Sequence, residues 1–169
     1  MQETEQGAHP LALVLASHLA ASGDHLVTAE SCTGGLLAGA FTSVPGSSAW
    51  FDQGWITYTN VSKQAQLGVS QESLKNFGAV SEVVAKQMAA GALAMAPQAT
   101  LALSTTGIAG PGGGSADKPV GLVWFGFARR TEEDTVVTAV SQVFTGDRAA
   151  VRQASVVFSI EQLIAWLKP

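Results

Sequence analysis

Short apolar runs and longer amphipathic stretches follow one another along this chain, and they predict strands and helices in turn. The apolar runs at residues 25–29, 54–59 and 99–105 each end in small or polar residues, which is typical of buried strands that lead into turns. Residues 10–23 carry apolar side chains at helical spacing behind Pro10, a residue that favours a helix start. Further helices are predicted at residues 33–43, 60–67, 70–77, 81–96 and 149–167.

Two β-rich runs at residues 120–130 and 135–144 predict an antiparallel hairpin, because only a short acidic turn joins them. Strands that alternate with helices are typical of a layered α/β domain, and the hairpin makes its sheet mixed. We therefore expect a three-layer α/β/α sandwich with a mixed, mostly parallel sheet and a C-terminal hairpin plus helix. The polar residues 1–8 are expected to form a disordered tail, and residues 9–169 a single domain.

Composition and charge argue against several classes of function. The formal net charge is −4 and the nine lysines and arginines are scattered, so the chain lacks the basic field that general DNA or RNA binding requires. It has no apolar run of about 18 residues for a membrane helix, and its acidic start is unlike a secretory signal. Cys32 is the only cysteine, which fits a reducing compartment, and we predict a cytoplasmic protein. The three histidines have no partner at metal-ligand spacing, so no metal site is predicted.

The turn after the first predicted strand offers a candidate nucleophile. An apolar strand that ends in a small polar turn and opens a helix exposes the Ser31 hydroxyl beside the free backbone N–H groups of that helix. This arrangement suits an activated nucleophile next to an oxyanion hole. One alternative is a tight turn in which Thr33 caps the helix. Another is Cys32 as the nucleophile, although no histidine is placed by sequence to generate its thiolate.

Tyr58 and Lys63 meet at the junction between a predicted strand and the helix that follows it. With Asn60 as the N-cap, Lys63 falls at about the third helical position, where the helix dipole and an apolar wall both lower a lysine pKa. A lysine shifted in this way can act as a base near neutral pH. An exposed, solvated lysine is the alternative. Tyr58 is either a proton relay or a packing residue.

A glycine-rich loop and an arginine are candidate anion-binding elements. Residues 107–114 follow a strand, and bare N–H groups in such a loop can cradle phosphate, although the spacing matches neither the Walker A pattern nor a dinucleotide fingerprint. A wide turn is the alternative. Arg148 precedes the last helix, where a guanidinium and helix N–H groups can hold an anion together. The alternative for Arg148 is a surface pair with Asp147 or Glu161.

Four stretches of the chain carry a family resemblance when they are taken in order. They are residues 29–35, the segment from Gly54 through Tyr58 and Lys63 to Val69, residues 106–121, and residues 146–148. Together they resemble the C-terminal domain family of the competence-damage-inducible protein CinA, from about residue 10 to the end of the chain. Ser115, Asp117 and Ala149 depart from the usual family residues. Longer CinA proteins carry a further N-terminal nucleotide-processing domain, so we expect the stand-alone form here.

The resemblance implies an amidohydrolase domain that converts nicotinamide mononucleotide to nicotinate mononucleotide and ammonia during pyridine-nucleotide recycling. It implies Ser31 as the nucleophile, Lys63 as the general base and Tyr58 as the partner in proton transfer, without a cofactor. The residues expected to bind the substrate are Cys32, Thr33, Gly34, Gly46, Ser48, Thr105, Gly107, Ala109, Gly110 and Arg148.

Two other interpretations of the same residues stay open. A non-catalytic regulatory module that binds pyridine nucleotides would use the same loops. An interaction domain linked to DNA uptake or repair is suggested by the family name, and the acidic charge disfavours direct DNA contact. Trp50, Trp55 and Trp166 offer apolar surface for a homodimer or, alternatively, side chains for the core.

Overall fold

The computed structural model describes the backbone of residues 3–168 and the side chains of residues 10–168. Its helices are α1 (Glu3–Ser22), α2 (Leu36–Thr42), α3 (Asn60–Leu67), α4 (Gln71–Phe77), α5 (Glu82–Met95) and α6 (Arg148–Leu167). Its strands are β1 (Leu26–Glu30), β2 (Phe51–Ile56), β3 (Leu101–Gly107), β4 (Leu122–Arg130) and β5 (Thr135–Val143), and a 3-10 turn, η1 (Ser47–Ala49), precedes β2. None of the described helices has both the length and the apolar character needed to cross a bilayer.

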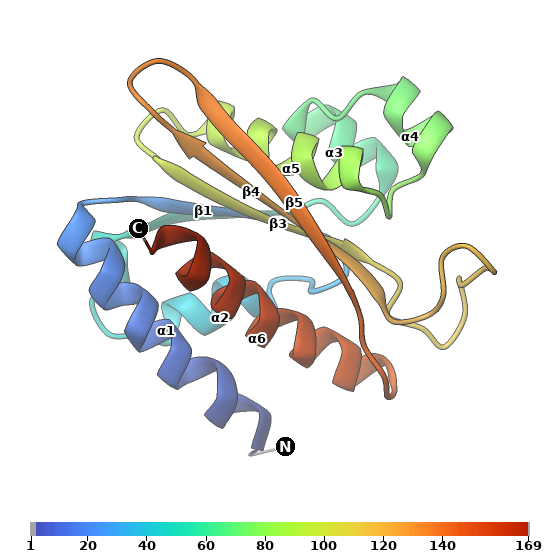
Figure 1. Cartoon of the computed structure of the whole chain (residues 1–169), viewed down its shortest axis with the longest axis horizontal. Helices are drawn as coiled ribbons and strands as arrows, with labels where there is room; N and C mark the ends of the chain where they lie inside the picture. Colours follow the sequence, from blue (N-terminus) through green and yellow to red (C-terminus); the bar gives the residue numbers. More distant parts are fainter. Residues whose placement is uncertain (1–2, 169) are drawn as a thin grey trace.

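The strands form one mixed sheet in the order β2-β1-β3-β4-β5. β1 lies parallel to both β2 and β3, whereas β4 is antiparallel to both β3 and β5. Within the described sheet only β4 therefore runs against the other strands, and the predicted mixed, mostly parallel sheet with its C-terminal hairpin is confirmed. Helices α1, α2 and α6 cover one face and α3, α4 and α5 the other, which gives the three predicted layers (Figure 1).

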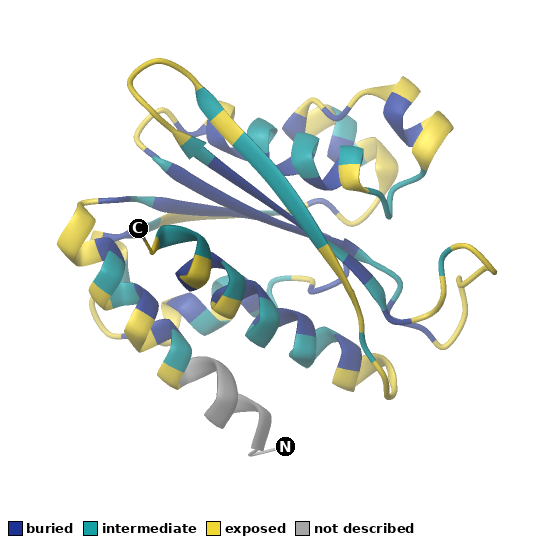
Figure 2. Ribbon diagram, viewed as in Figure 1, coloured by how far each residue is buried: buried dark blue, intermediate teal, exposed yellow. Residues whose placement is uncertain are grey.

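The central strands β1 and β3 are buried along nearly their whole length (Figure 2). Successive side chains of a strand point to opposite faces, so Leu26 packs in the core beneath α1, α2 and α6, whereas Val27 packs in the core beneath α5. Both faces are covered, and this is why these strands read as continuous apolar runs in the sequence.

Two of the tryptophans that offered surface for a homodimer pack within the chain. The rings of Trp50 and Phe41 meet edge to face with centroids 5.7 Å apart, and Trp166 lies 5.8 Å from Phe127. Trp50 is buried, and Trp166 packs against the same core. The homodimer stays a prediction.

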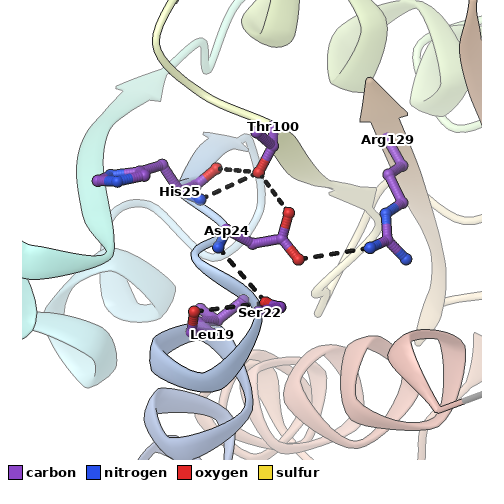
Figure 3. Close-up of polar contacts among 6 residues, drawn as sticks. All are labelled: Leu19, Ser22, Asp24, His25, Thr100 and Arg129. Carbon is purple, nitrogen blue, oxygen red and sulfur yellow. Dashed lines mark hydrogen bonds and ion pairs between the residues drawn. The ribbon is translucent and has the colours of Figure 1, made fainter. Parts of the chain in front are cut away.

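A polar cluster joins three strands at the amino end of β1 (Figure 3). The Asp24 carboxylate accepts hydrogen bonds from the Thr100 hydroxyl, at 2.7 Å, and from Arg129, at 3.4 Å. The Thr100 hydroxyl oxygen also accepts the N–H of His25, at 3.0 Å. These contacts hold β1 against β3 and β4 at the end of the sheet opposite Ser31.

The starts of α1 and α3 differ from the prediction, and that of α2 is described with the site below. α1 begins at Glu3, so Pro10 lies inside the helix instead of in its first turn. The tail predicted over residues 1–8 falls outside the described side chains and stays a prediction. α3 is capped by Thr59, one residue before the predicted cap, because Thr59 and Ser62 exchange hydrogen bonds between side chain and backbone. Lys63 is therefore the fourth residue of α3.

Candidate active site

A cavity of about 190 Å³ lies at the carboxyl ends of β1, β2 and β3. Ligand sites of α/β sheets form at this edge because the loops that follow the strands meet there. Ser31 follows β1, Tyr58 follows β2 and Gly107 ends β3, while Arg148 enters from the start of α6. The residues that line the cavity are Ser31, Cys32, Tyr58, Asn60, Lys63, Ala79, Val80, Thr106, Gly107, Ala109 and Arg148.

Lys63 and Ser31 form a direct side-chain pair in the wall of this cavity. The Nζ of Lys63 donates hydrogen bonds to Ser31 Oγ, at 2.9 Å, and to the Thr57 carbonyl oxygen, at 2.8 Å. Lys63 is only 1% exposed, and this burial lowers its pKa from 10.5 to about 8. Lys63 is therefore not the exposed, solvated lysine considered as the alternative. It is buried and is largely neutral in mildly alkaline solution.

The buried carboxylate of Glu30 holds the start of α2. It accepts hydrogen bonds from three N–H groups at this helix start, at 2.9–3.2 Å, and from the Thr33 hydroxyl, at 2.7 Å. α2 begins at Leu36, later than predicted, and Thr33 does not cap it. The expectation that N–H groups of the first helical turn face the nucleophile is therefore wrong, because Glu30 occupies them.

Two N–H groups of the turn itself remain available. Among the described residues, the N–H groups of Cys32 and Thr33 have no hydrogen-bond acceptor. Their neighbours are occupied: the Ser31 N–H donates to the Thr105 carbonyl at 2.9 Å, and the Gly34 N–H donates to the Ser31 carbonyl at 3.1 Å. The candidate oxyanion hole therefore lies directly after Ser31, in the turn and not in the helix.

The Cys32 thiol is a poor rival to the Ser31 hydroxyl. Burial raises the pKa of Cys32 to about 12, so the thiol is protonated at neutral pH. The thiolate is the nucleophilic form of cysteine, and here it is scarce. Cys32 therefore contributes its N–H group and a part of the cavity wall.

Arg148 bridges two loops at the edge of the cavity. Its guanidinium donates to the Gly110 carbonyl oxygen at 2.9 Å and to the Tyr58 hydroxyl at 2.6 Å. Asp147, considered from the sequence as its surface partner, instead caps α6. Lys63 contacts Tyr58 through the main-chain carbonyl, at 3.4 Å, while the Tyr58 hydroxyl is turned to the arginine. In this structure Tyr58 holds Arg148 in place.

The glycine-rich loop reaches the cavity with its first residues. Gly107 and Ala109 line it, and Gly110 supplies the carbonyl that receives Arg148. A Cβ on Gly107 would lie 2.6 Å from the side chain of Val123, so this glycine lets the chain pass close to β4. Close packing therefore accounts for at least one glycine of this loop, for which a phosphate cradle and a wide turn were the two alternatives.

Three of the predicted substrate-binding residues have no side chain in the cavity lining. Thr33 and Thr105 are fully buried, and their hydroxyls share a hydrogen bond at 2.7 Å. A Cβ on Gly34 would lie 3.1 Å from Nη2 of Arg152. Thr33 and Gly34 belong to the turn that follows Ser31, and Thr106 lines the cavity where Thr105 was expected.

The structure does not bring Gly46 and Ser48 to this cavity. Both precede β2, and the Leu26 N–H at the start of β1 donates to the Trp50 carbonyl at 2.7 Å, directly after η1. A strand rises about 3.3 Å per residue, so this end of β1 is roughly 16 Å from Ser31. The substrate-binding role predicted for these two residues therefore has no counterpart in the cavity of one chain.

Two charged residues that hold the Ser31 turn were not among the residues predicted from the sequence. One is Glu30, described above. The other is Arg152, whose Nε and Nη2 donate to the carbonyl oxygens of Cys32 and Thr33, each at 3.0 Å. Arg152 lies four residues after Arg148, so both arginines extend from one face of α6, and this spacing was the available signal.

The fold and the site together define an α/β/α protein with a buried serine–lysine pair at the carboxyl edge of its sheet. Comparison with known proteins then gives the family. The CinA C-terminal domain model matches residues 8–167, and the chain belongs to this family.

Relatives align with nearly the whole chain. It is 51% identical over 158 residues to the nicotinamide-nucleotide amidohydrolase PncC of Enterobacter agglomerans, and the alignment covers 94% of each protein. It is 48% identical over 145 residues to the PncC protein of Escherichia coli K12, with 86% of each covered. Among solved structures, it is similar to the competence/damage inducible protein CihA of Agrobacterium tumefaciens, with a TM-score of 0.88, 44% identity and 96% of each chain covered.

Proposed function

We propose that this chain hydrolyses the carboxamide of nicotinamide mononucleotide to nicotinate mononucleotide and ammonia. The observation that carries the proposal is the 2.9 Å contact between Lys63 Nζ and Ser31 Oγ, made by a lysine whose pKa is lowered to about 8. Two relatives named nicotinamide-nucleotide amidohydrolase support the choice of substrate. The free thiol of Cys32 fits a reducing compartment, and we place this pyridine-nucleotide recycling step in the cytoplasm.

Acylation begins when the Ser31 proton moves to neutral Lys63. The Oγ–H bond of Ser31 breaks, a bond forms between Oγ and the carboxamide carbon, and the carbonyl π electrons move onto oxygen. The pyridinium ring withdraws electrons from the carboxamide, so its carbon is more electrophilic than that of an ordinary amide. The N–H groups of Cys32 and Thr33 receive the resulting oxyanion.

Collapse of this tetrahedral intermediate expels ammonia, which takes the proton held by Lys63, and leaves an ester on Ser31. Water then adds to the ester carbonyl while Lys63 accepts a proton from it. The second collapse returns that proton to Ser31 Oγ and releases the nicotinate carboxyl group. One amide and one water are consumed, and one carboxylic acid and one ammonia are formed.

Arg148 is the residue that we assign to the phosphate of the substrate. It stands at the N-terminus of α6, where the helix dipole favours an anion, and its guanidinium can pair with two phosphate oxygens. The backbone of Gly107 and Ala109 borders the same cavity. Arg148 exchanges the Tyr58 hydroxyl for phosphate when the substrate binds, and the released Tyr58 then assists Lys63 in proton transfer.

Ammonia release from nicotinamide mononucleotide by the purified chain tests this proposal, with a chelator present to test the predicted independence of metal. The wild type should release ammonia, and Ser31→Ala should lose kcat by about 10³-fold or more while it still binds the nucleotide, because Arg148 is untouched. Turnover retained by Ser31→Ala would contradict the assigned nucleophile. Binding without turnover by the wild type would instead favour the regulatory module.

A further inference from the structure

We propose that Arg152 is a positioning residue of the oxyanion hole, an inference that rests on the proposed function. Its Nε donates to the carbonyl oxygen of Cys32, which belongs to the same peptide unit as the Thr33 N–H. A trans peptide directs its C=O and its N–H to opposite sides, so a guanidinium held on the carbonyl fixes the direction of the Thr33 N–H. The contact spans 120 residues of sequence, which ties α6 to the turn that carries Ser31.

The second arm of the guanidinium reaches the other oxyanion donor through one intervening peptide. Nη2 of Arg152 donates to the Thr33 carbonyl, whose peptide partner is the Gly34 N–H. That N–H donates to the Ser31 carbonyl at 3.1 Å, and the Ser31 carbonyl shares its peptide with the Cys32 N–H. Hydrogen-bonded peptides polarise one another, so the positive charge of Arg152 strengthens both free N–H groups as donors.

The surroundings of Arg152 leave its charge to act on the turn. Among the described side chains, no carboxylate forms an ion pair with it. Gly34 has φ +57°, and a Cβ there would lie 3.1 Å from Nη2, so glycine makes room for the guanidinium. On the other flank, Glu30 binds the N–H groups at the start of α2. The turn is held between a buried carboxylate and a guanidinium, and each takes a different set of its polar groups.

The oxyanion exists only during the reaction, so loss of Arg152 should lower kcat and leave KM nearly unchanged. Arg152→Met keeps the apolar stem, and we expect kcat to fall by about 10- to 100-fold with KM within about threefold. Arg152→Lys keeps the charge but lacks the rigid fork that contacts two carbonyls, and should lose about tenfold. The midpoint of the pH–rate profile should stay near 8, because Lys63 is untouched.

Arg129→Gln is the matched control. Arg129 also donates a hydrogen bond from one element to another, from β4 to Asp24 before β1. It lies in the polar cluster at the end of the sheet opposite the cavity (Figure 3). This variant loses an arginine contact without a change near the cavity, so its kcat and KM should equal those of the wild type.

Labelling with diisopropyl fluorophosphate gives a second readout that does not need the nucleotide. Ser31 Oγ forms a bond to phosphorus, fluoride leaves, and the serine proton goes to Lys63, while negative charge builds up on the phosphoryl oxygen. Mass spectrometry of the intact chain follows the reaction. Both Arg152 variants should label at least about tenfold more slowly than the wild type and Arg129→Gln.

The outcomes separate this inference from the proposed function. The inference would be overturned if an Arg152 variant that keeps the wild-type melting temperature also kept the wild-type kcat and labelling rate. A loss confined to KM would overturn it as well, because ground-state binding forms no oxyanion. A wild type that labels at Ser31 but releases no ammonia refutes the proposed substrate, and the ratio of labelling rates still decides the role of Arg152.

Discussion

In the proposed mechanism only the neutral form of Lys63 can accept the proton of Ser31, so the charge of this one residue should set the rate. Burial disfavours the ammonium and lowers the pKa of Lys63 to about 8, so the neutral fraction grows as the pH rises through that value. We expect kcat/KM to rise about tenfold per pH unit below this pKa and to level off above it. Ammonia release measured from about pH 6 to about pH 10 checks the profile.

The matching control at this position is Lys63→Met, which fills similar space without an amine. It should lose about 10²- to 10⁴-fold in kcat/KM, and its residual rate should no longer depend on pH near 8. A wild-type profile that is flat across neutral and mildly alkaline pH would contradict Lys63 as the base.

At the level of single residues, the sequence predicts which side chains meet at the ends of neighbouring strands. It does not predict contacts that depend on how a distant helix packs. Ser31 and Lys63 follow two strands that pair in parallel, so their proximity could be expected from the chain order. Arg152 contacts the Ser31 turn only because α6 packs across the sheet from the far end of the sequence. The four-residue spacing from Arg148 indicates a shared helix face, but nothing local to Arg152 indicates that this face meets the Ser31 turn.

At the level of elements, α2 depends on a cap that lies outside the helix. It has seven residues, and Gly35 at its N-cap provides no side-chain hydrogen bond. So short a helix is marginal by itself, and the Glu30 carboxylate supplies the missing acceptors. Glu30→Gln places an NH₂ group among N–H donors, and we expect it to lower the free energy of unfolding by about 2–4 kcal/mol, measured by urea denaturation.

Glu82→Gln is the control for that substitution, because Glu82 is a glutamate beside another helix start, in the first turn of α5. Its side chain is 50% exposed in an ion pair with Lys86, so its loss should cost less than about 1 kcal/mol. Equal losses in the free energy of unfolding of the two variants would show that the buried contacts of Glu30 stabilise the fold no more than an exposed ion pair does.

The distance in sequence between a helix start and the residue that caps it explains which helix starts could be predicted. The caps of α4 and α5, Ser70 and Ser81, accept the N–H three residues further on, so the signal lies within four residues of sequence. Glu30 belongs to the strand before α2 and reaches past the turn, so local capping rules cannot place that helix start.

At the level of the whole molecule, strand direction decides which predicted residues can meet. A chain that leaves the carboxyl end of β1 and enters β2 in parallel must first return to the amino edge of the sheet. Gly46 and Ser48 lie on that return, so the parallel pairing of β1 and β2 places them away from the cavity of the same chain, and their substrate-binding role stays a prediction. The motif resemblance assigned residues without this constraint.

Lys63 also links the stability of the whole domain to pH. In the unfolded chain it titrates near 10.5, and in the native chain burial lowers its pKa to about 8. Between these values the unfolded state holds a proton that the native state lacks, so the free energy of unfolding rises with pH. The stabilisation is complete above the unfolded pKa and is lost as the pH falls to 8, and the difference between 10.5 and 8 corresponds to about 3 kcal/mol.

This linkage can be measured against a variant in which residue 63 carries no proton. In urea denaturation, the free energy of unfolding of the wild type relative to Lys63→Met should increase by about 2 kcal/mol from about pH 7 to about pH 9.5. Lys86→Met removes an exposed lysine instead, and its difference from the wild type should stay within about 0.5 kcal/mol over the same range. If the Lys63→Met difference were equally constant, Lys63 would have an ordinary pKa in the native protein. The buried lysine would then stay charged in mildly alkaline solution as well, and the reaction would need another base to take the proton of Ser31.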